Sequence, residues 1–370
     1  MPSSRANAVH VMKMSHAFSR EVEPFCMYAY SSSPRDHESL FQRYGTKPFA
    51  MRLSRRFKIP GYLHYYSRMV ARQLRITKTD LAYSRFLLGS RLAQKSKIPS
   101  VTELHSDLWN KNKNHKHWFD SLVASNLTLG FVTISDTLKQ DLLEAYPQVD
   151  SSRVLVAHDA ADLPVTSTEP VANRLEKWVG KPQVGYTGSL HQGKGADMLV
   201  KLANRSEFRD VQFHVVGGNQ EQIESYRRQT TQGNVVFHGH VDHANIINFI
   251  RAFDVCLLPN EPVIKTGAKA QNISRYTSPL KLFEYMSCSK AIICSDLEVL
   301  REILNEDNAV LVDALDEDAW AIGLQKLLDG PQLRTDLGTT AHRDFCEKHT
   351  WQRRAKTIAE WCESRLAAAA

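Results

Sequence analysis

The stretch VGYTGSLHQGKG, Val184–Gly195, decides the fold of the second half of the chain. It has the pattern of a short apolar strand, a turn rich in glycine and the start of a helix, which together open a βαβ unit. Gly188, Gly193 and Gly195 allow the backbone to approach a phosphate closely, and the N-terminus of the helix attracts anions. Lys194 adds a positive charge, so the stretch predicts a diphosphate-binding turn.

Two other interpretations fit this stretch. The spacing from Gly188 to Lys194 matches the GxxxxGK of a P-loop, but a P-loop continues with Ser or Thr to hold magnesium, and here Gly195 follows. The second alternative is a tight turn with an exposed lysine.

The surrounding pattern is typical of a parallel sheet covered by helices, because short apolar runs alternate with helical patterns from about residue 80 onward. In the first half we expect strands at Asp80–Arg85, Ser100–Ser106, Gly130–Ser135 and Arg153–His158, and helices at Phe86–Lys95 and at Asp136–Tyr146, with Ser135 or Asp136 as N-cap. In the second half we expect strands at Gln183–Thr187, Val211–Val216, Asn234–Phe237, Asp254–Leu258, Ala291–Ser295 and Ala309–Asp313. The helices between them are expected near Ala196–Ala203, Ala244–Phe253, Ser278–Cys288 and Asp316–Leu328.

The chain has 370 residues, which exceeds what one hydrophobic core usually supports, so two α/β domains are expected. Asp159–Pro170 holds two prolines without an apolar period, which is typical of a linker. We place one domain at 1–162 and the other at 163–349. The helix expected within 350–370 follows the second domain and is predicted to cross back towards the first.

The composition, with 42% hydrophobic and 24% charged residues, is that of an ordinary globular protein. The sequence has neither an apolar run long enough to span a membrane nor the apolar core of a signal peptide, so a cytoplasmic location is expected. The net charge of +7 favours an acidic partner such as nucleotide phosphate, anionic lipid or nucleic acid. No nucleic-acid-binding module accompanies this charge, so nucleic acid is not the expected partner.

A second motif, YTSPLKLFEYM at Tyr276–Met286, predicts another helix start. Ser278 suits the N-cap and Pro279 suits the first turn, where its missing N–H costs nothing. Glu284 follows about one and a half turns in, where a carboxylate could accept hydrogen bonds from two ribose hydroxyls. As an isolated helix, the motif is equally compatible with Glu284 as a surface residue.

These segments resemble the retaining glycosyltransferases of family 4, which have the GT-B fold of two facing Rossmann-like domains with a cleft between them. The similarity rests on the order of motifs along the chain. In the second half these are VGYTGSL with GKG, VVGG at Val215–Gly218, NVVFHGHV at Asn234–Val241, DVCLLP at Asp254–Pro259 and SPLKLFEYM. Weaker similarities to the family in the first half are AVHVMKMSHAF, SVTELHS, FVTISDTLKQDL and RVLVAHDAAD.

The resemblance implies a role for each matching residue. Lys194 would neutralise the donor diphosphate, Glu284 would bind the ribose, and His105 would face the donor sugar across the cleft. The remaining donor-binding residues would be Gly188 and Ser189 in the glycine turn, Phe237 and Gly239 beside the base, and Ser278, Pro279, Leu280 and Lys281, whose backbone groups would contact phosphate and sugar.

The reaction implied is transfer of a sugar from a nucleoside-diphosphate sugar to an acceptor hydroxyl, with attack from the face that the diphosphate leaves. No metal, other cofactor or protein nucleophile is expected. The acceptor could be a glycan, a lipid-linked sugar or a small molecule.

Two features depart from the family pattern. The family often pairs two glutamates separated by seven residues, whereas the position eight before Glu284 is Tyr276. GT-B proteins also begin with a strand and a glycine-rich loop, whereas Ser3–Met14 resembles the end of that loop and the first helix. The first strand is therefore expected to be missing or degenerate.

Two alternative functions fit the same architecture. A sugar-nucleotide epimerase also uses two facing Rossmann-like domains, although it would need carboxylates in the cleft. A degenerate protein could bind a nucleotide sugar without transferring it.

A basic segment lies between Arg43 and Lys78, which contains no acidic residue. Its cations are Arg43, Lys47, Arg52, Arg55, Arg56, Lys58, Arg68, Arg72, Arg75 and Lys78, interleaved with Phe49, Phe57, Tyr62, Tyr65, Tyr66 and Met69. Basic and aromatic residues on one surface favour contact with an anionic membrane, and a solvated basic surface is the alternative. A membrane contact would make peripheral attachment and a role in cell-surface glycan or glycolipid assembly the expected setting.

Overall fold

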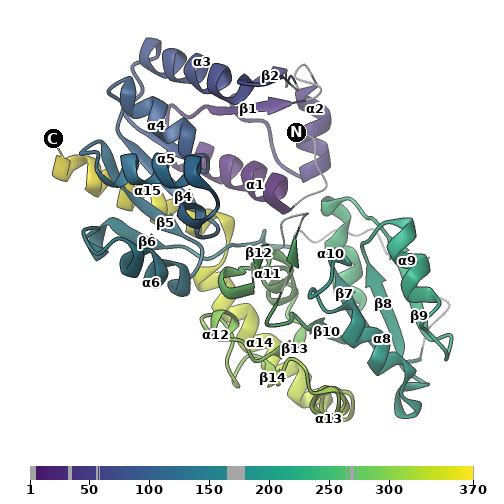
Figure 1. Ribbon diagram of the computed structural model, residues 1–370. Helices are drawn as coiled ribbons and strands as arrows, with labels where there is room; N and C mark the ends of the chain where they lie inside the picture. The colour runs from purple at the N-terminus through teal and green to yellow at the C-terminus, as the bar shows by residue number, and fades with distance from the viewer. Residues whose placement is uncertain are drawn as a thin grey trace. The chain divides into compact units, whose positions relative to one another are not determined.

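The computed structural model describes residues 6–31, 36–55, 57, 59–164, 180–263, 265–266, 271–272 and 274–369. The chain divides into two compact units (Figure 1). The N-terminal unit comprises Met1–His158 together with Trp351–Ala370, and the C-terminal unit comprises Asp159–Thr350. Each unit is an α/β structure with its own parallel sheet.

The C-terminal unit is built on a six-stranded parallel sheet with the order β14-β13-β10-β7-β8-β9. Its strands are β7 (Gln183–Thr187), β8 (Gln212–Val216), β9 (Val235–Gly239), β10 (Val255–Leu258), β13 (Ala291–Ser295) and β14 (Val310–Val312). From β7 the chain proceeds to one edge of the sheet through β8 and β9, and from β10 it proceeds to the other through β13 and β14. The neighbours β7 and β10 therefore mark the point where open α/β sheets bind ligands.

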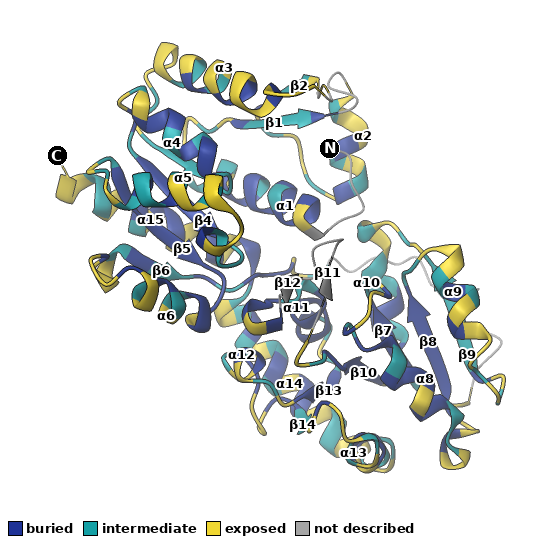
Figure 2. Ribbon diagram, viewed as in Figure 1, coloured by how far each residue is buried: buried dark blue, intermediate teal, exposed yellow. Residues whose placement is uncertain are grey.

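Helices cover both faces of this sheet, as the doubly wound pattern predicts. They are α8 (Ala196–Asn204), α9 (Gln220–Arg227), α10 (His243–Ala252), α11 (Leu280–Ser287), α12 (Glu298–Arg301), α13 (Glu317–Asp329) and α14 (Pro331–Lys348). Strand β10 supplies both cores, because Val255 and Leu257 pack with α8 and α13 while Cys256 and Leu258 pack with α10 and α11. Figure 2 accordingly shows the central strands as buried.

The main sheet of the N-terminal unit is parallel, with the order β3-β4-β5-β6. Its strands are β3 (Ala82–Ser84), β4 (Ser100–Leu104), β5 (Thr128–Thr133) and β6 (Val154–Val156). The helices are α1 (Ala6–Glu21), α4 (Leu87–Lys95), α5 (Lys113–Val123), α6 (Asp136–Ala145) and α15 (Trp351–Ala369). The Ser135 hydroxyl accepts a hydrogen bond from Leu138 N at 3.2 Å, which confirms the predicted N-cap of α6. Helix α15 packs against α1 and β5 within this unit.

A second parallel sheet in the N-terminal unit contains β1 (Met27–Ser31) and β2 (Met51–Arg55), which pair with each other. Helices α2 (His37–Tyr44) and α3 (Tyr62–Ile76) accompany them. The sequence did not predict these strands, because MYAYS and MRLSR mix aromatic, polar and charged residues without a clear apolar run. The described chain enters this unit as α1, and Met1–Arg5, where the loss of the first strand was expected, lie outside the described residues.

No helix within the described ranges is both long enough and apolar enough to cross a membrane.

Candidate functional site

Glycine turns meet at the carboxyl ends of β7, β8 and β9. Gly188 donates its N–H to Val216 O at 2.9 Å, and Gly217 donates to Gly239 O at 2.8 Å. Gly217 has a φ of +133°, and a Cβ there would lie 1.9 Å from Gly188 O. The close approach of these backbones therefore requires glycine.

A second close contact lies at the point where β7 and β10 are neighbours. Gly195 precedes α8 with a φ of +93°, and a Cβ on it would lie 2.1 Å from Pro259 O, just after β10. Only glycine allows the N-terminus of α8 to sit against the end of β10. The free N–H groups of this helix end contribute a partial positive charge beside the Gly188 turn.

Two lysines also lie in this region. Lys281, in the first turn of α11, is buried, and its Nζ has no hydrogen-bond partner among the described residues. Burial first, and the nearby Lys194 second, hold the pKa of Lys281 well below its ordinary value. Burial also lowers the pKa of Lys194, and no ion pair within the described ranges involves either ammonium group. Two cations that lack a carboxylate partner form a site that an anion would complete.

The start of α11 differs from the prediction. The helix begins at Leu280, and Pro279 occupies the N-cap position with an extended conformation, φ −79° and ψ 120°. Ser278 is not the N-cap, because its Oγ accepts a hydrogen bond from Asp159 N at 2.9 Å and lies outside the helix. The hydroxyl thus fixes the chain at the start of the C-terminal unit and leaves the first N–H groups of α11 without a side-chain cap.

Glu284 is buried in α11, so the structure excludes the interpretation of this residue as an exposed surface group. Its Oε1 lies 2.8 Å from Nε2 of His243, the first residue of α10. Sequence reasoning missed His243, because nothing in its local pattern links it to a residue 41 positions later.

Two tyrosines flank Glu284 in sequence. Tyr285 is held at the end of β7, because Thr187 N donates a hydrogen bond to its hydroxyl at 2.8 Å. The position eight before Glu284, where the family often has a second glutamate, holds the buried aromatic side chain of Tyr276.

The other predicted residues of the C-terminal unit lie after β7, near the end of β9 and at the start of α11. Ser189 is exposed next to Gly188, and its carbonyl accepts a hydrogen bond from the Tyr186 hydroxyl at 2.8 Å. Phe237 is half-buried near the end of β9, and Gly239 closes that strand with a φ of +73°. Leu280 is half-buried at the start of α11.

His105 belongs to the N-terminal unit, where it directly follows β4. Its Nε2 lies 2.8 Å from Oε1 of Glu103. Its participation in the same site as Lys194 and Glu284 remains a prediction.

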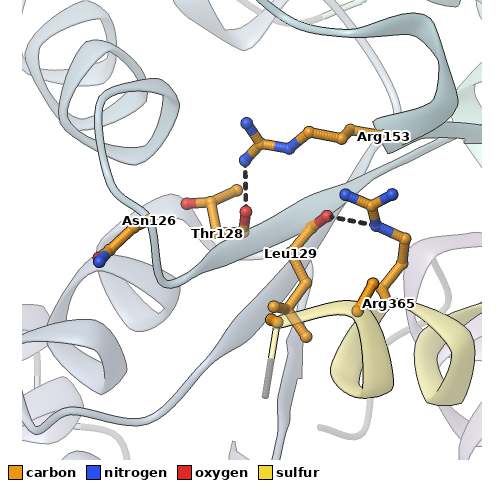
Figure 3. Close-up of a pocket in the computed structure, with 7 residues that line it drawn as sticks. Asn126, Thr128, Leu129, Arg153 and Arg365 are labelled. Carbon is orange, nitrogen blue, oxygen red and sulfur yellow. Dashed lines mark hydrogen bonds between the residues drawn. The ribbon is translucent and has the colours of Figure 1, made fainter.

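A cavity of about 180 Å³ in the N-terminal unit contains none of the predicted residues (Figure 3). Its walls include Arg153, which donates to the carbonyl of Thr128, and Arg365, whose Nε donates to Leu129 O at 3.2 Å. Both guanidinium groups are thus used to hold β5, so we do not assign this cavity a role.

Residues 181–330, which include the glycine turns, both lysines and Glu284, match the family model described as glycosyl transferases group 1. This segment belongs to the group 1 glycosyl transferases. Among curated relatives of the chain, the D-inositol 3-phosphate glycosyltransferase of Xylanimonas cellulosilytica is 28% identical over 224 residues, covering 55% of this chain and 49% of that protein. The phosphatidyl-myo-inositol mannosyltransferase of Mycolicibacterium smegmatis is 27% identical over 212 residues, covering 56% and 50%. The chain thus spans about half the length of these two relatives.

Solved structures match the fold of the chain over both units. The crystal structure of HepE from Anabaena in complex with UDP-glucose has a TM-score of 0.74 at 15% identity and covers 98% of this chain and 97% of that chain. A sucrose-phosphate synthase from Thermosynechococcus elongatus has a TM-score of 0.70 at 16% identity, with 98% and 94% covered. The fold is therefore GT-B-like, as the resemblance implied.

Proposed function

We propose that this protein is a retaining glycosyltransferase that moves a sugar from a nucleoside-diphosphate sugar to an acceptor hydroxyl. The observation that carries the proposal is the pair Lys194 and Lys281. The Lys281 ammonium group lies beside the Gly188 turn, close enough to Lys194 for the two charges to repel, and neither lysine forms an ion pair in the described part of the chain. A donor diphosphate brings the negative charge that this arrangement lacks.

The charges fit the leaving group of such a reaction. The bond from the anomeric carbon to the diphosphate oxygen breaks, a bond to the acceptor oxygen forms on the same face, and the acceptor proton passes to the departing phosphate. Lys194, Lys281 and the N-terminus of α8 stabilise the negative charge that develops on the diphosphate. This assignment requires neither a metal ion nor a protein nucleophile.

Glu284 is assigned to the ribose of the donor. As a buried carboxylate with one oxygen near His243, it retains acceptor capacity for the two ribose hydroxyls. Uridine is the first base to test, because HepE, which shares the fold, is described in complex with UDP-glucose.

The acceptor is proposed to be membrane-associated, and the support for this comes from α3. One side of this helix is buried through Tyr62, Tyr66 and Ala71. The other side exposes apolar and basic residues together, namely Leu63, Tyr65, Arg68, Met69, Arg72, Arg75 and Ile76 (Figure 2). Tyr65 and Ile76 are 67% and 62% exposed, which is unusual for such large side chains and favours contact with an anionic lipid surface.

The test has two steps. The unfolding temperature is first measured with UDP, GDP, ADP and CDP, because a ligand at 100-fold its Kd adds roughly 2.7 kcal/mol of stability. Sugars carried by the stabilising nucleotide are then incubated with the protein and candidate acceptors, and proton NMR identifies the anomeric configuration of the product. Stabilisation followed by a product of retained configuration is expected. Binding without any transfer would instead identify a degenerate nucleotide-sugar-binding protein, and no stabilisation by any nucleotide would refute the donor site.

A further inference from the structure

A buried carboxylate in the N-terminal unit contacts side chains from four parts of the fold. Glu103, in β4, has a fully buried side chain. Its Oε1 lies 2.8 Å from His105 Nε2, 2.8 Å from Arg354 Nη2 and 3.1 Å from His10 Nε2. Its Oε2 accepts a hydrogen bond from the Tyr83 hydroxyl at 2.8 Å. Helix α1, strand β3, strand β4 with the loop that follows it, and helix α15 thus all meet at one carboxyl group.

The carboxyl group is ionised in this environment. Burial alone would raise the pKa of Glu103, but Arg354, and after it His10 and His105, hold that pKa well below its ordinary value. Arg354 is itself buried, and it also donates to the carbonyls of Ala157 and His158. The guanidinium group is therefore fixed in place, and Glu103 acts only as a hydrogen-bond acceptor.

An ionised Glu103 determines which nitrogen of His105 carries the proton. Because the carboxylate only accepts, Nε2 of His105 must carry the hydrogen that lies between them. Burial first, and Arg85 second, lower the pKa of His105 to about 4, so the ring is neutral at neutral pH. The lone pair then resides on Nδ1, which has no hydrogen-bond partner within the described ranges. The side chain is 23% exposed at the carboxyl end of β4.

The neighbouring His10 supports the same arrangement. Arg85 Nη1 lies 2.6 Å from Nδ1 of His10, and because a guanidinium group only donates, this Nδ1 must accept. Nε2 of His10 then carries the hydrogen, and this nitrogen lies 3.1 Å from Glu103 Oε1. The two imidazole rings pack in a T-shaped arrangement, with an interplanar angle of 89° and their centres 4.9 Å apart, which restricts rotation of His105.

We infer that Glu103 is a positioning residue that fixes His105 in the Nε2–H tautomer, so that Nδ1 accepts a hydrogen bond from a sugar hydroxyl of the substrate. An unprotonated ring nitrogen matches a hydroxyl donor, whereas it repels a phosphate, which offers only acceptor oxygens at neutral pH. The carboxyl end of a parallel strand is also where α/β sheets bind ligands. The inference rests on the proposed sugar transfer for the identity of the hydroxyl, but the tautomer is a property of the free protein.

The tautomer is tested first, by nitrogen NMR on the full chain labelled at histidine, with the His105 signal assigned from its loss in His105→Asn. In the wild type at pH 7, the expected spectrum has the proton on Nε2 and an unprotonated Nδ1. Glu103→Gln is expected to introduce the other tautomer, whereas Tyr83→Phe removes a hydrogen bond from the same carboxylate and leaves the spectrum unchanged. A wild-type Nδ1–H tautomer would overturn the inference, even if Glu103→Gln failed to fold.

The role of Nδ1 is tested with the donor and acceptor that support transfer. Glu103→Gln is expected to lower kcat/KM about 10-fold or more, as for a lost hydrogen bond to substrate, and to leave the Kd of the free nucleotide unchanged. A series of deoxy-sugars should contain one analogue that the wild type and His105→Asn use equally well. If His105→Asn lowers activity equally for every analogue, Nδ1 does not bind a hydroxyl. If no nucleotide binds at all, the proposed function fails while the tautomer result still stands.

Discussion

Lys281 places its ammonium nitrogen 3.8 Å from the centre of the Tyr186 ring, in the buried region beneath the Gly188 turn. The face of the ring attracts a cation, but it replaces only part of the hydration that burial removes. The hydroxyl of the same tyrosine donates to Ser189 O and thereby fixes the orientation of the ring. Lys281 is thus held close to the glycine turn without a hydrogen-bond partner for its ammonium group among the described residues, which disfavours the charged form in the free protein and favours binding of an anion.

Glu284→Gln should separate ribose recognition from phosphate recognition. The wild type should bind a ribonucleoside diphosphate more tightly than its 2′-deoxy form, because the carboxylate accepts from the ribose hydroxyls. The variant should lose this preference and about 10- to 100-fold of kcat/KM, as a hydrogen bond to a charged group is worth roughly 1.5–3 kcal/mol.

Calorimetric Kd values for the two nucleotides provide the measurement. Glu298→Gln, at an exposed position in α12, is the matched control and should behave as the wild type. An undiminished preference for ribose in Glu284→Gln would show that another residue binds the hydroxyls.

The doubly wound half of the fold could be predicted from the sequence because its strands are continuous apolar runs between glycine turns. β7 and β13 lie at the predicted residues, since both are buried in the centre of the sheet. β1 and β2 were missed, because their half-exposed residues carry no such pattern. The helix predicted from Ser278 begins at Leu280 instead. Ser278 is held outside the helix by its contact with Asp159, which the sequence could not predict because the two residues are 119 positions apart.

The site residues also differ in whether the sequence alone could predict them. Lys194 lies in a glycine motif that is visible in the sequence, whereas the unpaired side chain of Lys281 depends on the packing of α11 against Tyr186. Partners from distant parts of the chain, such as His243 for Glu284 and Arg354 for Glu103, become apparent only when the chain is folded.

Arg354→Met should strongly destabilise the N-terminal unit. It leaves the buried carboxylate of Glu103 without its charged partner, and breaking a buried ion pair from one side costs about 3–5 kcal/mol. Urea unfolding followed by circular dichroism measures this loss. Lys356→Met, at an exposed position two residues along α15, should change the free energy of unfolding by less than about 0.5 kcal/mol. Equal stability of the two variants would show that the contact contributes little.

His214 should make the stability of the C-terminal unit depend on pH. Burial, and secondarily His238, lower the pKa of His214 to about 3 from its ordinary 6.5. As the pH falls through 6.5, the unfolded chain gains a proton that the folded protein does not take up, so the free energy of unfolding decreases towards acid pH.

His214→Gln provides the comparison. It removes the titrating group and can still donate to Gln183 Oε1 and accept from His238, the two partners that lie 2.6 and 3.0 Å from the imidazole nitrogens. Denaturant unfolding at pH 4.5 and 7.5 should show a smaller decrease in the variant. The same decrease in both proteins would assign the pH dependence to other groups.

Replacing Arg68, Arg72 and Arg75 of α3 with Ser should weaken binding to anionic liposomes. Each basic residue near an anionic leaflet contributes roughly 1 kcal/mol, so binding should fall by more than about 10-fold and should also decrease with added salt. The control replaces Arg209, Arg227 and Arg228, which are exposed on the C-terminal unit, with Ser. Flotation with phosphatidylserine-containing and neutral vesicles measures the effect. Equal recovery of both triple variants with anionic vesicles would exclude α3 as the lipid contact.

Calorimetric comparison of a nucleoside diphosphate with its monophosphate tests the donor site most directly, because it isolates the terminal phosphate. In the wild type, the diphosphate should bind about 10- to 100-fold more tightly, since Lys194 and Lys281 would contact the additional phosphate. Lys281→Met should lose most of this difference while its free energy of unfolding without ligand stays equal to or above that of the wild type, because a buried unpaired cation has been removed. Lys201→Met, at an exposed position in α8, should retain both properties. A Lys281→Met variant that keeps the full preference for the diphosphate would contradict the account.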